Sequence, residues 1–153
     1  MNDIDFAAAQ KLGLGWLAAI YYDMEAYPRG GACTAAVQSF TDGWVIQLHN
    51  RGHLAAMYSS LCSGILDQAA SVTIPGRHSL DAIWIAAWNN TPNIYGFGSP
   101  CALSDSLWSD HQRVHQYIGG HNEAFYLRVY GAGEYRYPGA DVGVVVTRGR
   151  MQT

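Results

Sequence analysis

Five short apolar runs, separated by turn-forming residues, constrain the fold of this chain more than any other feature. The runs cover residues 17–22, 54–58, 82–88, 114–118 and 142–146. Each has the length of a strand and is bounded by Gly, Pro, Asn or Asp. Continuous apolar runs of this kind are typical of strands inside a parallel sheet. We therefore expect five strands that are buried on both faces.

Helical patterns lie between several of these runs. The strongest covers residues 34–51, where apolar side chains recur at helical spacing and Gly52 follows as a stop signal. Residues 4–12 and 60–70 carry shorter patterns, and 119–140 is typical of a long loop with an irregular hairpin. Strands that alternate with helices predict a parallel sheet, either open and doubly wound or closed into a barrel. Five strands are too few for a complete eight-stranded barrel.

The size and charge of the chain exclude several function classes. With 153 residues, 14% of them charged, it has the composition of one globular domain. A net charge of −3 argues against binding to nucleic acid or to an anionic membrane surface. No apolar run is long enough for a membrane span, and the N-terminal stretch lacks the basic and apolar regions of a signal peptide. We expect no nucleic-acid partner, no membrane span and no export signal in this chain.

The cysteines and histidines do not predict a metal site. Cys33, Cys62 and Cys101 share no metal-like spacing, and their odd number leaves at least one thiol free or paired outside the chain. The spacing of His111, His115 and His121 gives no closed set of zinc ligands, so His115 is better interpreted as a core residue. The sequence also lacks a phosphate-binding glycine loop. We expect neither a metal nor a cofactor.

Polar and aromatic side chains follow several of the expected strands at the point where each ends. Asp23 and Glu25 follow the first strand, Trp88 closes the third, and Gln116 with Tyr117 closes the fourth. Ligands of parallel α/β folds bind at the carboxyl ends of the strands. We therefore expect these side chains to line one ligand-binding site. Successive strand residues point to opposite faces, so only one of Gln116 and Tyr117 can face it.

The two carboxylates have the spacing that glycosidic chemistry needs. On an extended backbone Asp23 and Glu25 point to the same side, with their Cα atoms about 7 Å apart. Glycosidases use one carboxylic acid to protonate the leaving oxygen and a second group to stabilise or attack the anomeric carbon. The structural alternative for the pair is that these residues cap a helix or pair with Arg29.

Four segments resemble the secreted bacterial glycoside-hydrolase-like domain, a distant relative of the glycoside hydrolase family 25 lysozymes. The segments are IYYDMEAY, LHNRGHLAAMYSS, DAIWIAAWN and LWSDHQRVHQYIGGHNE, in the family's order and within residues 3–123. The resemblance implies an α/β fold that is a partial (β/α)8, TIM-barrel-like structure. These segments would supply strands four to seven of the barrel, and GADVGVVV would supply the eighth.

The resemblance also implies roles for individual residues. Glu25 would be the proton donor, and Asp23 would stabilise the charged intermediate, by substrate assistance. The substrate-binding residues would be Tyr22, Tyr58, Trp88, Gln116, Tyr117 and Asp141. The ligand would be a cell-wall polysaccharide of the peptidoglycan kind, and the protein would act outside the cell.

Two departures from the family pattern modify this expectation. The family's domain begins with three earlier strands, and the stretch after Glu123 is longer than in the family and unlike it. We therefore expect residues 1–153 to form a single truncated domain with strands four to eight. Its open sheet edges would favour self-association. The alternatives to a glycosidase are a non-catalytic carbohydrate-binding or cell-envelope protein and an inactive gene fragment.

Overall fold

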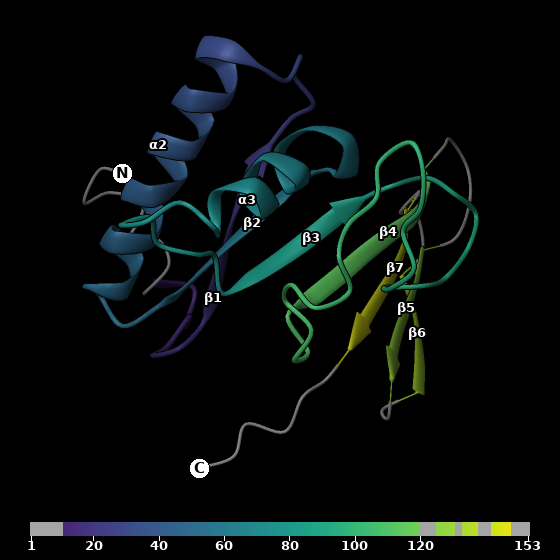
Figure 1. Cartoon of the computed structure of the whole chain (residues 1–153). Helices are drawn as coiled ribbons and strands as arrows, with labels where there is room; N and C mark the ends of the chain where they lie inside the picture. The colour runs from purple at the N-terminus through teal and green to yellow at the C-terminus, as the bar shows by residue number, and fades with distance from the viewer. Residues whose placement is uncertain (1–10, 120–124, 131–132, 138–141, 148–153) are drawn as a thin grey trace.

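A seven-stranded mixed sheet organises the part of the chain that the structure describes (Figure 1). The computed structural model describes residues 11–119, 125–130, 133–137 and 142–147. The strands are β1 (Ala19–Met24), β2 (Leu54–Ser60), β3 (Ala82–Ala86), β4 (Arg113–Gly119), β5 (Phe125–Tyr130), β6 (Gly133–Tyr137) and β7 (Val142–Thr147). They lie in the order β1-β2-β3-β4-β7-β5-β6.

The first four strands are parallel, so the predicted α/β class is confirmed. In register, Asp23 lies beside Tyr58, and Tyr58 lies beside Trp84. β1 begins two residues later than the apolar run predicted. Leu17 has a left-handed φ of 63°, and its backbone N–H donates to the carbonyl of Gly52, so extended structure can start only after this turn.

The strands after β4 enter the sheet differently from the expectation. β5 and β6 form an antiparallel hairpin, which confirms the hairpin predicted within residues 119–140. β7 pairs antiparallel with β4 and parallel with β5. Residues 142–146 were expected to be a last parallel strand, and this orientation differs from that. For β7 to run parallel to β4, the chain would have to cross back to the amino end of β4 before β7 begins. The segment between β4 and β7 forms the β5–β6 hairpin of the same sheet instead.

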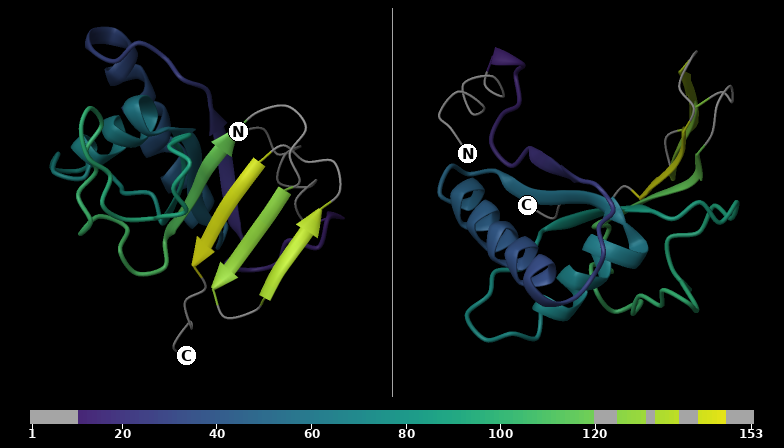
Figure 2. Two further views of the ribbon diagram at one scale, coloured as in Figure 1. Left: turned by 90° about the vertical axis from the view of Figure 1, so that its right-hand side faces the viewer. Right: turned by 90° about the horizontal axis from the view of Figure 1, so that it is seen from above.

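Helices cover one side of the sheet. α2 (Gly31–His49), the π-helix η1 (Leu61–Ile65) and α3 (Leu66–Ser71) lie on the same side of the curved sheet (Figure 2). The helices predicted at 34–51 and 60–70 are thus confirmed in place, and most of the helix predicted at 4–12 lies outside the described residues. No helix in the described ranges is long and apolar enough to cross a membrane.

The core fills the space between this side of the sheet and the helices. It contains Met57, Ile83 and Ile85 from the strands, and Val45 and Leu48 from α2. The inward face of α2 carries the buried residues Thr41, Val45 and Leu48. Phe40 and Trp44 lie beside that face and pack against Tyr22 instead.

The opposite side of the sheet is more open than the sequence predicted. Burial on both faces is wrong for β1, whose Ala19 and Asp23 are exposed. β1 pairs only with β2 in the described sheet, so no neighbouring strand covers its outer edge. Because side chains alternate along a strand, Tyr22 faces the helices, whereas Tyr21 and Asp23 face away from them.

Candidate functional site

A cleft of about 460 Å³ opens at the carboxyl ends of β1, β2 and β3. Its walls include Glu25, Tyr58, Ser60, Cys62 and Trp88, and its remaining lining residues are apolar. Three of the predicted site residues therefore meet here: Glu25, Tyr58 and Trp88. The indole of Trp88 is 66% exposed, so an aromatic face is available to a ligand.

The two carboxylates lie near Tyr58, Asp23 in β1 and Glu25 just after its end. Asp23 lies beside Tyr58 in register, and Glu25 is the second residue after it along the chain. Both are exposed, and neither has a hydrogen-bond or ion-pair partner among the described residues.

The structural alternatives for this pair are not observed. Arg29 donates from Nε to Oδ1 of Asp67 at 2.6 Å rather than to Asp23 or Glu25. The N-cap of α2 is Gly30, and no side chain caps that helix.

Tyr58 connects the carboxylates to β4. Its hydroxyl donates to Oε1 of the buried Gln116 at 2.8 Å. The pKa of Tyr58 is raised, first by burial and then by the negative charges of Asp23 and Glu25. The electrostatic influence of both carboxylates thus reaches the cleft wall. The ring of Trp84 packs edge-on against Tyr58 with centroids 5.5 Å apart.

Three predicted site residues are not found at the cleft in the described structure. Tyr22 packs against Phe40 of α2, and Tyr117 contacts the ring of the buried His115, so both lie on the helix-covered side of the sheet. Asp141 lies outside the described residues. The alternation of side chains explains the split, since Tyr22 is next to Asp23 and Tyr117 is next to Gln116 in the sequence.

β4 fixes the segment that carries Trp88. The ring nitrogens of His115 lie against the carbonyl oxygens of Ala87, at 2.8 Å, and of Asn93. The backbone N–H of Ala87 donates to the carbonyl of Gln116 at 3.1 Å. Burial lowers the pKa of His115, and its hydrogen bonds to the two carbonyls oppose this. His115 is therefore a buried core residue, as its sequence context indicated.

A buried carboxylate in α3 holds the connection that follows Glu25. The side chain of Asp67 is 1% exposed and accepts hydrogen bonds from Tyr27 at 2.8 Å, Arg29 at 2.6 Å and Thr34 at 2.7 Å. Burial alone would raise the pKa of Asp67, but these hydrogen bonds outweigh it and hold the pKa below its ordinary value. Asp67 carries no signal in the sequence, because only tertiary contacts distinguish it from a surface residue of a helix.

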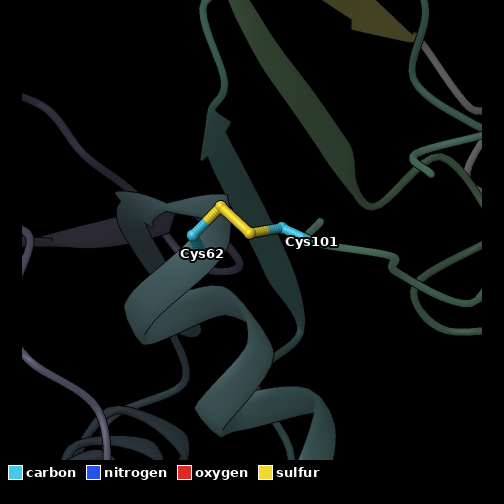
Figure 3. The surroundings of a disulfide bond; sticks show 2 residues. All are labelled: Cys62 and Cys101. Atoms are coloured by element: carbon cyan, nitrogen blue, oxygen red, sulfur yellow. A yellow bond between two sulfur atoms is a disulfide. The ribbon is translucent and has the colours of Figure 1, made fainter. Parts of the chain in front are cut away.

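A disulfide bond braces the cleft wall (Figure 3). Cys62 of η1 is bonded to Cys101 in the connection between β3 and β4, with their Cα atoms 5.2 Å apart. Cys33 is a free, exposed thiol. The sequence left the pairing open, since three cysteines allow three different single bridges.

Comparison with known proteins identifies the family. Residues 4–130 match the model of the Rv2525c-like, glycoside hydrolase-like domain. No curated protein and no solved structure matches the chain. The matched range includes the cleft, Asp23, Glu25 and all four parallel strands. This chain therefore belongs to the family of Rv2525c-like, glycoside hydrolase-like domains.

Proposed function

We propose that this protein hydrolyses glycosidic bonds of a peptidoglycan-like cell-wall polysaccharide, with Glu25 as the proton donor. One observation carries the proposal. Glu25 is a carboxylate without a protein partner in the described chain, and it lines an aromatic-walled cleft at the carboxyl end of a parallel sheet. This end of a parallel sheet is where α/β folds bind ligands.

The proposed reaction uses the two carboxylates in different roles. Glu25 transfers a proton to the glycosidic oxygen as the bond between that oxygen and the anomeric carbon breaks. Asp23 stabilises the positive charge that develops on the sugar. Water then adds to the anomeric carbon, and the proton that it releases restores Glu25.

Tyr58 and Trp88 would orient the sugar in this reaction. Trp88 offers an exposed aromatic face to a sugar ring. The hydroxyl of Tyr58 is held by Gln116 at 2.8 Å, so its oxygen can still accept a hydrogen bond from the ligand.

We further propose that β1 to β4 correspond to strands four to seven of a (β/α)8-like barrel. The support is that the four strands are parallel, that the helices lie on one side, and that the site residues face the other side or the carboxyl ends.

Action outside the cell is also proposed. The disulfide between Cys62 and Cys101 supports it, since such bonds persist in oxidising compartments. Recovery of the chain outside the cell with this disulfide intact would agree with the proposal. A reduced cytosolic chain would contradict it.

A second candidate function is carbohydrate binding without turnover. The exposure of both carboxylates favours it, because a general acid that works near neutral pH is usually kept protonated by an apolar pocket. Trp88 and Tyr58 would serve binding equally well in this case.

Lysis of purified cell walls separates the two functions. We expect wild-type protein to clear a cell-wall suspension and Glu25→Gln to be slower by about 10²–10⁴-fold, the usual contribution of a general acid. Asp110→Asn is the matched control, since its carboxylate is 93% exposed and precedes β4 at the other end of the sheet. Equal clearing by wild type and Glu25→Gln would remove Glu25 from the mechanism. Binding to the walls without release of product would support the second candidate.

A further inference from the structure

The cleft combines one acidic side chain with an almost entirely apolar and aromatic wall, and a second acidic side chain lies next to Tyr58 of that wall. Glu25 lines the cleft, and Asp23 stands beside Tyr58. Both carboxylates are exposed and have no ion-pair partner among the described residues. A ligand in this cleft therefore lies close to two acidic groups that have no basic partner in the described part of the chain.

No basic side chain lines the cleft in the described part of the chain. The basic residue nearest to Glu25 in the sequence is Arg29, whose Nε is held by Asp67 at 2.6 Å. Asp67 is buried and also accepts hydrogen bonds from Tyr27 and Thr34, so this carboxylate fixes the guanidinium in place. An anionic sugar would thus meet two carboxylates and no cation to pair with.

The aromatic residues of the cleft favour a cation as well. Trp88 presents an indole that is 66% exposed, and Tyr58 contributes a second ring to the wall. Aromatic faces attract ammonium groups, and an ammonium placed between such a ring and a carboxylate gains from both interactions.

We infer that the cleft selects glycans by charge, taking hexosamine units with a free, protonated amine in preference to N-acetylated units and rejecting anionic sugars. This inference rests on the proposed carbohydrate site and adds a substrate class to it. Peptidoglycan-like polymers whose hexosamines have lost their acetyl groups are the ligands of this kind in a cell wall.

Three tetrasaccharides of equal length test the inference by calorimetry on the whole chain. The probes are the tetramers of glucosamine, N-acetylglucosamine and galacturonic acid. At pH 6 an amine with a pKa of about 8 is protonated and ordinary carboxyls are ionised. In 20 mM salt we expect the glucosamine tetramer to bind about tenfold more tightly than the N-acetylated one, and the galacturonic acid tetramer to bind most weakly. The preference should shrink to about threefold in 300 mM salt, because salt screens exposed charges.

Variants that remove an acidic group but keep the shape of the side chain test whether Asp23 and Glu25 cause the preference. Asp23→Asn and Glu25→Gln should each reduce the ratio between the affinities for the glucosamine and the N-acetylglucosamine tetramers. Asp110→Asn, 93% exposed and before the amino end of β4, should leave the preference unchanged. Since neither cleft carboxylate has a partner in the described structure, these changes should leave the unfolding temperature of the protein unaltered, which a thermal melt checks.

The outcomes distinguish this inference from the proposed function. Equal affinity for the two hexosamine tetramers, or tighter binding of the galacturonic acid tetramer, would overturn the charge selection and leave the carbohydrate site standing. Failure of the wild type to bind any of the three probes would overturn the proposed function, and the selection with it.

Discussion

At the scale of single residues, the exposed indole of Trp88 is the side chain on which we expect ligand affinity to depend most. It lines the cleft and is 66% exposed, so its removal should leave the fold intact while taking away a stacking surface. We predict that Trp88→Ala weakens binding of a hexosamine oligomer by about tenfold, or about 1.4 kcal/mol. Titration calorimetry measures this directly.

Trp16 provides the matched control for Trp88. Its side chain is 79% exposed and lies over Gly52, away from the residues that line the cleft. Trp16→Ala should therefore bind the oligomer like the wild type. Equal loss in both variants would show that the effect of Trp88→Ala is not specific to the cleft.

Asp67 is the residue whose ionisation should matter most for stability. It is buried, and its carboxylate accepts three side-chain hydrogen bonds. We predict that Asp67→Asn lowers the free energy of unfolding at pH 7 by about 2 kcal/mol, since a neutral amide replaces a charged acceptor. Chemical denaturation measures the difference.

The pH dependence of this effect has a defined sign. The pKa of Asp67 is lowered in the folded protein from its ordinary value of 3.8. Its stabilising contribution is therefore present in full above about pH 4 and is lost as the pH falls through the lower, folded value. The stability difference between wild type and Asp67→Asn should shrink below pH 4. A constant difference down to pH 2 would contradict the assignment, and Asp110→Asn serves as the exposed control.

At the scale of elements, the π-helix η1 depends on close packing against β2. A Cβ atom added to Gly64 would lie 2.3 Å from Oγ and 2.8 Å from Cβ of the fully buried Ser59. Rotation of the hydroxyl relieves only the first of these contacts. We predict that Gly64→Ala lowers the free energy of unfolding by about 1–3 kcal/mol through overpacking. Because η1 carries Cys62 and Leu61 into the cleft wall, ligand affinity should fall as well.

The same substitution in α2 should have the opposite effect. Gly43 lies within this helix, is exposed, and has no atom within 4 Å of an added Cβ. Gly43→Ala should stabilise the protein by about 0.5–1 kcal/mol, because alanine loses less conformational freedom in a helix. If both variants were equally destabilised, packing at η1 would not be the cause.

At the scale of the whole molecule, β1 forms one edge of the described sheet. β1 pairs with β2 alone in the described sheet, and an edge strand presents unpaired backbone groups to other chains. We predict that the protein self-associates and that sedimentation velocity detects this as a concentration-dependent increase in mass. Ala19→Lys, which puts a charge at an exposed position of β1, should reduce the association. A monomer at all concentrations would refute the prediction.

The sequence specified the elements well because their signals are local. The run at 54–58 became β2, and the helical spacing at 34–51 became α2, each within a few residues of the expected bounds. Asp23 lies in β1 beside Tyr58, whereas Glu25 follows the end of that strand and lines the cleft. Tyr22 was predicted to bind substrate, and the alternation of side chains places it on the other side of β1 from Asp23, against Phe40 of α2.

Only the tertiary structure decided which side chains act together. Contacts between distant segments determined the pairing of Cys62 with Cys101, the three hydrogen bonds on Asp67 and the bond between Tyr58 and Gln116. The same holds for β7, whose antiparallel orientation depends on how a hairpin enters the sheet rather than on its own residues. Periodicity and turn residues report the conformation of a few neighbouring residues. The site, in contrast, depends on the alignment of β1 to β4 and on the charges that this alignment leaves without partners.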